Sequence, residues 1–344
     1  MNGSRNVLTV LLAHFIVTVI HAQQPVIPQL FQEDRPMAIR LDVSLADVRK
    51  NKNDSTYFPT TLRYKDTQGV WDSLPVTVRA RGNFRRKHCF FPPIRVKINK
   101  NASKGTPFAG NKNLKLVLPC QSDKNANQLV MKEFICYQLY EPVTSNTFDT
   151  RLLEVTLSDA SGKQPRVYQL TGIFVEDDDA AARRLNATAI DEPKINPLQL
   201  QDTSVLRFDL FQYMIANTDF STTFSHNVKT IKINDGRYIP IPYDFDMAGF
   251  VNAPYATFDE SLGIRSVHER VYKGYCRDET ITQIVRNEYI GLEPEIIAVI
   301  DRYKNQFEPK EFTALRKYMD EFFTMLKNDS FYREEIIRNC RTPK

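Results

Sequence analysis

Residues 226–246 read HNVKTIKINDGRYIPIPYDFD, and this stretch decides how the second half of the chain folds. Apolar and polar residues alternate over 228–233 and again over 238–243, which predicts two β-strands. The Asn-Asp-Gly sequence between them is typical of a tight hairpin turn. The hairpin therefore brings Asn227, just before its first strand, beside Asp244, just after its second.

Oxygen-bearing side chains surround this predicted hairpin. Asp219 follows an apolar segment at 205–216 that predicts a buried helix. Asn227 opens the hairpin, and Asp244 and Asp246 close it. Ligand sets made only of carboxylate and amide oxygens suit Mg²⁺ or Mn²⁺, and such sites are often shared with phosphate oxygens. A simpler interpretation is that these residues only form turns and helix caps, as Asp and Asn often do.

The order of these residues matches the needs of phosphoryl transfer. In protein kinases a catalytic Asp and an Asn precede the metal-binding Asp of a hairpin. The gaps are wider here, with eight positions from Asp219 to Asn227 and 17 from Asn227 to Asp244. The chain has no HRD or DFG triplet and no Gly-rich phosphate loop upstream, which excludes a conventional eukaryotic kinase.

The composition describes a globular protein of 344 residues, with 42% hydrophobic and 25% charged residues. This length suits one large domain or two lobes around a cleft. The formal net charge of +5 is close to balance, so no nucleic-acid partner is expected. Twelve glycines are few for this length and argue against a Gly-rich dinucleotide-binding fold.

Residues 1–22 predict an export signal. Arg5 precedes an apolar stretch at 7–20, and Ala22 is a small residue suited to the position before the cut. The apolar stretch is short for a membrane span and polar residues follow it, so we expect a cleaved peptide and no stable span afterwards. The mature protein is then periplasmic, displayed on the cell surface or secreted.

Five cysteines follow the signal, which is an odd number. Export makes disulfides possible, and at least one thiol stays free or pairs between chains. Cys89 and Cys120 end neighbouring strand-like segments and are candidates for one bridge, and Cys276 and Cys340 for another. Cys136 lies within an apolar helical segment, which predicts a buried thiol.

Hydrophobic periodicity divides the chain into two parts of different character. Strand-like alternation occurs at 39–43, 76–81, 94–98, 112–118, 152–157 and 167–175. Helical patterns occur at 126–140, 205–216, 295–306 and 310–327. We therefore expect an α+β fold, with a β-rich N-terminal lobe at 23–190 that carries one helix and a mainly helical C-terminal lobe at 191–344.

At its polar motifs the chain resembles the CotH (spore coat protein H) family of secreted atypical protein kinases, and most closely the divergent members exported by Bacteroidetes-type bacteria. The motifs that carry the resemblance are Arg79-Ala80-Arg81-Gly82-Asn83, Gly172-Ile173-Phe174-Val175-Glu176, Asn217-Thr218-Asp219 with His226-Asn227, and Pro242-Tyr243-Asp244-Phe245-Asp246. The resemblance covers residues 75–275. It implies a kinase-like two-lobed fold that uses ATP and a divalent metal, Mg²⁺ or Mn²⁺, to phosphorylate protein hydroxyls.

The same resemblance implies a role for each residue around the hairpin. Asp219 takes the position of the catalytic-loop Asp. Asn227 and Asp244 take the metal-binding positions. Asp246 is then an auxiliary metal ligand or a neighbour of one.

The nucleotide-binding residues are less closely defined, because the family often places lysines just after its Arg-Gly segment and this chain has residues 89–93 (CFFPP) there. Lys97 and Lys115, on the next two predicted strands, are alternatives for the lysine that grips phosphate. Glu133 faces out of the predicted helix at 126–140 and is a candidate partner for either lysine, and Glu176 is its rival.

Arg81 belongs to a basic cluster that either holds phosphates or forms a solvated strand end. The members of this cluster are Arg79, Arg81, Arg85, Arg86 and Lys87.

Three functions follow as hypotheses. The first is an exported kinase that transfers the γ-phosphoryl group of ATP to a Ser or Thr of an envelope or secreted protein. The second is a metal-dependent glycosyltransferase that uses the Asp244-Phe245-Asp246 motif on a nucleotide sugar. The third is a catalytically inactive kinase-like surface or binding protein.

Overall fold

A computed structural model gives the arrangement of the chain. It describes residues 27–342 apart from Lys52, Asp54, Asn83, Lys124 and Pro193. The predicted export signal at 1–22 therefore lies outside the described residues, as does the last residue of the Arg-Gly motif. No helix within the described part is both long and apolar enough to cross a membrane.

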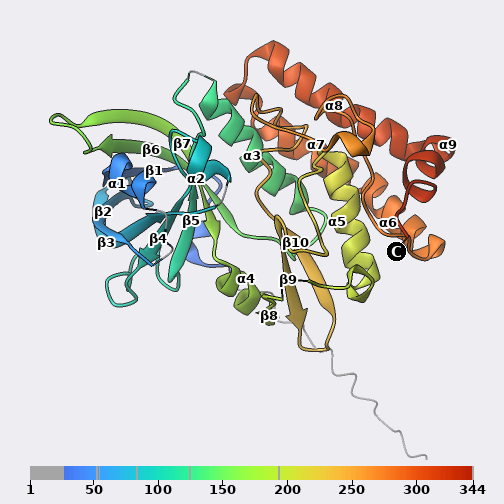
Figure 1. The fold of residues 1–344 in the computed structure, drawn as a ribbon, viewed down its shortest axis with the longest axis horizontal. Helices are drawn as coiled ribbons and strands as arrows, with labels where there is room; N and C mark the ends of the chain where they lie inside the picture. The colour runs from blue at the N-terminus through green and yellow to red at the C-terminus, as the bar shows by residue number, and fades with distance from the viewer. Residues whose placement is uncertain are drawn as a thin grey trace, which may run out of the picture.

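Seven strands of the N-terminal part close into a barrel (Figure 1). In spatial order they are β1 (Met37–Val43), β2 (Phe58–Lys65), β3 (Trp71–Ala80), β4 (Ile94–Ile98), β5 (Asn113–Val117), β7 (Arg166–Glu176) and β6 (Thr150–Asp159). Neighbouring strands are antiparallel except β1 and β6, whose parallel pairing closes the barrel. Alternate residues such as Ile39, Leu62 and Val96 fill the interior and leave the polar residues between them outside.

In the described residues of this part, four helices accompany the strands, where the sequence predicted one. They are α1 (Leu45–Lys50), α2 (Phe84–His88), α3 (Ala126–Tyr140) and α4 (Asp178–Arg184). α3 has the predicted bounds and lies between the barrel and the helical part of the chain (Figure 1). Because both sides of α3 are covered, Glu133 is buried, and the prediction that it faces outward is wrong.

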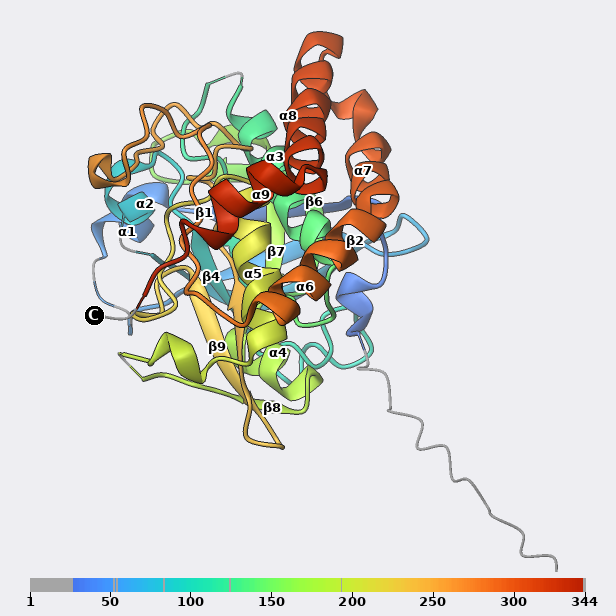
Figure 2. The same ribbon diagram turned by 90° about the vertical axis from the view of Figure 1, so that its right-hand side faces the viewer.

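The C-terminal part contains a small sheet and most of the helices. The sheet has the order β10 (Tyr238–Pro242), β9 (Val228–Ile233) and β8 (Ala187–Ala189). The helices are α5 (Asp202–Met214), α6 (Glu279–Gly291), α7 (Glu293–Arg302), α8 (Pro309–Lys327) and α9 (Asp329–Tyr332). Figure 2 views this helical side, with α5 and α6 in front of the barrel strands. The α+β class with a β-rich first part and a more helical second part is confirmed.

Two disulfides join Cys89 to Cys120 and Cys276 to Cys340, as the sequence suggested. Cys136 is a buried free thiol on α3. Disulfides of this kind form in oxidising compartments, so they indicate an extracytoplasmic environment.

Candidate functional site

The loop after α5 holds Asp219 in a fixed position. α5 ends at Met214, and Asn217 then donates from its side-chain amide to the side-chain oxygen of Gln212 (2.9 Å). The backbone N–H of Asp219 donates to the side-chain oxygen of Asn217 (3.0 Å). Lys273 donates to the backbone carbonyls on either side of Asp219, at 2.5 and 3.1 Å. Asp219 is therefore anchored through the backbone around it.

Both carboxylate oxygens of Asp219 have partners. Asn227 donates from Nδ2 to the backbone oxygen (2.8 Å) and to Oδ2 (2.9 Å) of Asp219, and His226 Nε2 lies 2.9 Å from Oδ1. The hydrogen bond to Asp219 is the main reason why the pKa of His226 is raised. The predicted meeting of Asp219 and Asn227 is confirmed, and 36% of the Asp219 side chain stays exposed to solvent.

The hairpin brings Asp244 to the same place, as predicted. Val228 pairs with Pro242, and the Tyr243 N–H donates to the Asn227 carbonyl (3.1 Å). The Asp244 N–H then donates to the hydroxyl of Tyr137 on α3 (3.0 Å). The hairpin end is thus tied to the helix that adjoins the barrel.

Strained, left-handed backbone conformations occur at and beside these residues. Among the described residues, six other than glycine have positive φ, and four of them are Ala216 (48°), Ser225 (51°), Asn227 (51°) and Asp244 (64°). Left-handed conformations outside glycine cost about 1–3 kcal/mol each and concentrate at functional sites. The strain therefore marks the same loops as the polar residues do.

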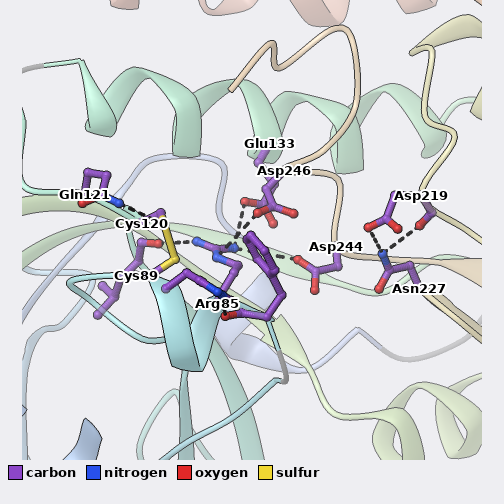
Figure 3. Close-up of polar contacts among 12 residues, drawn as sticks. Arg85, Cys89, Cys120, Gln121, Glu133, Asp219, Asn227, Asp244 and Asp246 are labelled. Atoms are coloured by element: carbon purple, nitrogen blue, oxygen red, sulfur yellow. Dashed lines mark hydrogen bonds and ion pairs between the residues drawn. A yellow bond between two sulfur atoms is a disulfide. The ribbon is translucent and has the colours of Figure 1, made fainter. Parts of the chain in front are cut away.

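A buried arginine faces the carboxylates at the end of the hairpin (Figure 3). Arg85 of α2 approaches Glu133 of α3 with Nη1 (3.5 Å), Asp244 with Nη1 (3.8 Å) and Asp246 with Nε (3.6 Å). Its remaining nitrogen, Nη2, donates to the Leu118 carbonyl (2.6 Å). Figure 3 shows Asp244 between Arg85 on one side and the Asp219–Asn227 pair on the other.

Burial shifts the pKa values of the charged residues in this cluster. It raises the pKa of Glu133 to about 8 and that of Asp246 to about 6, although the charge of Arg85 opposes both shifts. Burial also disfavours the charged form of Arg85, but the carboxylates of Asp246 and Glu133 outweigh this and raise its pKa. One guanidinium thus faces three carboxyl groups, so the cluster has an excess of acidic groups.

Lys115 and Lys97 occupy different surroundings. Lys115 is buried on β5, forms an ion pair with Asp178 of α4, and places its Nζ 4.3 Å from the centre of the Phe148 ring and 4.7 Å from that of Tyr243. Burial lowers its pKa. Lys97 is exposed on β4. Of the two alternatives, only Lys115 contacts a residue next to Asp244.

The expected lysine–glutamate pairs are not the ones that the structure contains. Glu133 pairs with Arg85, because the guanidinium of α2 lies nearer to it than the strand lysines do. Glu176 is fully buried and receives a hydrogen bond from Arg184 of α4 (2.8 Å), so it belongs to a separate ion pair. In the described part of the chain, neither glutamate is bridged to Lys115 or Lys97.

The basic cluster around Arg81 is not a solvated strand end. Arg79 and Arg85 are buried, and α2 begins at Phe84, directly after the Arg-Gly motif. Arg81 is half-buried. Its positive charge acts together with burial to lower the pKa of Lys115. The same charge lowers the pKa of Glu133, but burial outweighs it and raises that pKa overall. Arg81 therefore lies near both Glu133 and Lys115.

The structure brings most of the predicted site residues together without assembling a complete metal site. Within the described ranges, no three His, Cys, Asp or Glu side chains converge in a way that would hold a metal ion. Asp244 and Asp246 both form ion pairs with Arg85, whereas Asn227 is hydrogen-bonded to Asp219. Sequence reasoning missed the central position of Arg85 among these carboxylates, since α2 is only five residues long and shows no periodicity. No family model matches this chain, and no curated protein matches it significantly.

Proposed function

We propose that this protein is an exported, kinase-like phosphotransferase that moves the γ-phosphoryl group of ATP to a Ser or Thr hydroxyl of an envelope or secreted protein. The barrel and the helical part then correspond to the two lobes of an atypical kinase fold. The observation that carries the proposal is the hydrogen-bonded Asp219–Asn227 pair beside Asp244, in the chain order of a kinase site. The export signal predicted at 1–22 and the two disulfides support a place outside the cytoplasm.

Asp219 is the residue suited to receive the acceptor. Its backbone is held by Asn217 and Lys273, and its carboxylate is held by Asn227 and His226. A carboxylate fixed in this way and still partly exposed orients the attacking hydroxyl and accepts its proton.

The residues at the hairpin end fit a divalent cation. Asp244, Asp246 and Asn227 supply only oxygen ligands, and Asp246 Oδ2 is a buried oxygen with no hydrogen-bond partner in the described part of the chain. Bound Mg²⁺ or Mn²⁺ would neutralise the charge of the β- and γ-phosphates, whose oxygens would complete its ligand set. Lys115 and Arg81 are the cations suited to contact the phosphates, since both lie close to the hairpin end.

The test is phosphoryl transfer by the purified protein without residues 1–22. We expect ATP with Mn²⁺ to raise its melting temperature and to yield phosphorylated protein detectable by mass spectrometry. Asp219→Asn should abolish transfer while the protein still folds. Asp235→Asn is the matched control, because it removes a carboxylate from the turn of the same hairpin, where its ion-pair partner among the described residues is Arg237.

Other outcomes separate the alternative functions. Stabilisation by UDP- or GDP-sugars with Mn²⁺, and not by ATP, would favour a glycosyltransferase acting through Asp244 and Asp246. Cooperative unfolding without any response to nucleotide would favour an inactive binding protein. Either result would overturn the proposed kinase activity.

A further inference from the structure

We propose that Arg85 is a positioning residue of this site: from α2 it holds Asp244 and Asp246 in the geometry that receives a metal–nucleotide, and the Cys89–Cys120 disulfide keeps Arg85 in place. This inference rests on the proposed function, because it assigns Arg85 to the same site.

The burial of Arg85 is unusual for its helix. α2 has the sequence FRRKH, and its other members are exposed or half-buried, with even Phe84 43% exposed. Arg85 is only 5% exposed. An arginine is rarely buried while a neighbouring phenylalanine faces solvent, and it is kept inside only by groups that compensate its charge. Those groups are the carboxylates of α3 and of the hairpin end.

The distances show how Arg85 acts on these carboxylates. Its Nε and Nη1 lie 3.5–3.8 Å from the oxygens of Glu133, Asp244 and Asp246, and neither nitrogen has a hydrogen-bond partner in the described structure. These are ion-pair distances without direct hydrogen bonds. Arg85 therefore attracts the carboxylates toward one point and leaves their oxygens able to bind a further cation.

The disulfide fixes the other side of Arg85. Its Nη2 donates to the Leu118 carbonyl (2.6 Å), two residues before Cys120. The Cys89 N–H donates to the Arg85 carbonyl (2.9 Å), and the Phe90 N–H donates to the Cys120 carbonyl (2.7 Å). Figure 3 shows the disulfide directly beside Arg85. A five-residue helix has little stability of its own, so these links define where the guanidinium lies.

The experiment measures the affinity for Mn²⁺–ATP by calorimetry, together with cooperative thermal unfolding. We expect Arg85→Gln to weaken binding by about tenfold or more, which corresponds to about 1.4 kcal/mol, and Arg85→Lys to recover part of it. Arg63→Gln is the control, since Arg63 is an exposed barrel arginine that pairs with Asp42. In transfer assays, Arg85→Gln should raise the KM for Mn²⁺–ATP more than it lowers kcat.

The double variant Cys89→Ala/Cys120→Ala tests the same idea without changing the site itself. We expect weaker Mn²⁺–ATP binding from it than from Cys276→Ala/Cys340→Ala, which removes the other disulfide. If Arg85→Gln does not fold, this comparison decides. Wild-type protein that binds Mn²⁺–ATP, with Arg85 and Cys89/Cys120 variants that bind equally well, would refute the role of Arg85 alone. Wild-type protein that does not bind it would instead refute the proposed function.

Discussion

The buried carboxyl group of Asp209 makes the stability of the helical part depend on pH. Asp209 lies on α5 and is 4% exposed. Burial raises its pKa to about 8, and the charges of Arg277 and Arg341 oppose this shift only in part. At neutral pH the folded protein therefore keeps this carboxyl group protonated.

The sign of the effect follows from comparison with the unfolded chain, in which an Asp titrates near a pKa of about 3.9. Between about pH 4 and pH 8 the folded state holds a proton that the unfolded state has released. The free energy of unfolding therefore falls as the pH rises through this range. Each pH unit in this range lowers the free energy of unfolding by about 1.4 kcal/mol. Raising the pH from 5 to 8 therefore lowers it by about 4 kcal/mol through this residue.

The measurement is urea unfolding at pH 5 and pH 8 for the wild type and for Asp209→Asn. Other buried acids, such as Asp149 with a pKa raised to about 7 by burial, titrate in both proteins and cancel in the difference. We expect the wild type to lose about 4 kcal/mol more than the variant over this range. Asp320→Asn, which changes an exposed acid on α8 that does not contact Arg277 or Arg341, should lose as much as the wild type. Equal pH dependence of Asp209→Asn and wild type would refute the reasoning.

Two further predictions concern the packing and cross-linking of the helical part. A Cβ on Gly249 would lie 2.2 Å from the Val267 carbonyl oxygen, so Gly249→Ala should lower the free energy of unfolding in urea by about 1–3 kcal/mol. A Cβ on Gly291 would have no described atom within 4 Å beyond its own helix turn and chain neighbours, so Gly291→Ala should change this free energy little. Equal unfolding midpoints for the two variants would contradict this reasoning. Removing the Cys276–Cys340 bridge, which spans 64 positions, should lower the free energy of unfolding by about 4 kcal/mol, as measured by denaturation of the double alanine variant, and an unchanged value would show that the unfolded chain is not constrained by this bridge.

Elements with local signals could be predicted from the sequence. α3 has the expected bounds because its apolar face is continuous and Pro142 follows its end. β9 and β10 match because alternation and an Asn-Asp-Gly turn agree on one register. The hairpin in turn predicts that Asn227 lies beside Asp244, and the hydrogen bond from Tyr243 N–H to the Asn227 carbonyl confirms this.

The remaining features depend on contacts between distant segments. The sequence of β1 or β6 does not indicate that the two strands pair in parallel, because apolar and polar residues alternate in each of them as they do in the antiparallel strands. The burial of Glu133 depends on what covers the outer face of α3, and its pairing with Arg85 depends on a short helix that is tied down by a disulfide. Charged residues are usually exposed unless they are paired, and the sequence alone does not reveal the partner. The burial of Glu133 and its ion pair with Arg85 could therefore not be predicted.

The prolines of β10 have a consequence for how the protein behaves at high concentration. Tyr243 donates its N–H toward β9, so the alternation of the strand turns the nitrogens of Pro240 and Pro242 away from β9. Proline nitrogen carries no hydrogen, and a foreign strand would find no donors at these positions. Because the barrel strands of the described chain also pair in a closed ring, neither the barrel nor this edge of β10 offers a template for strand addition between copies.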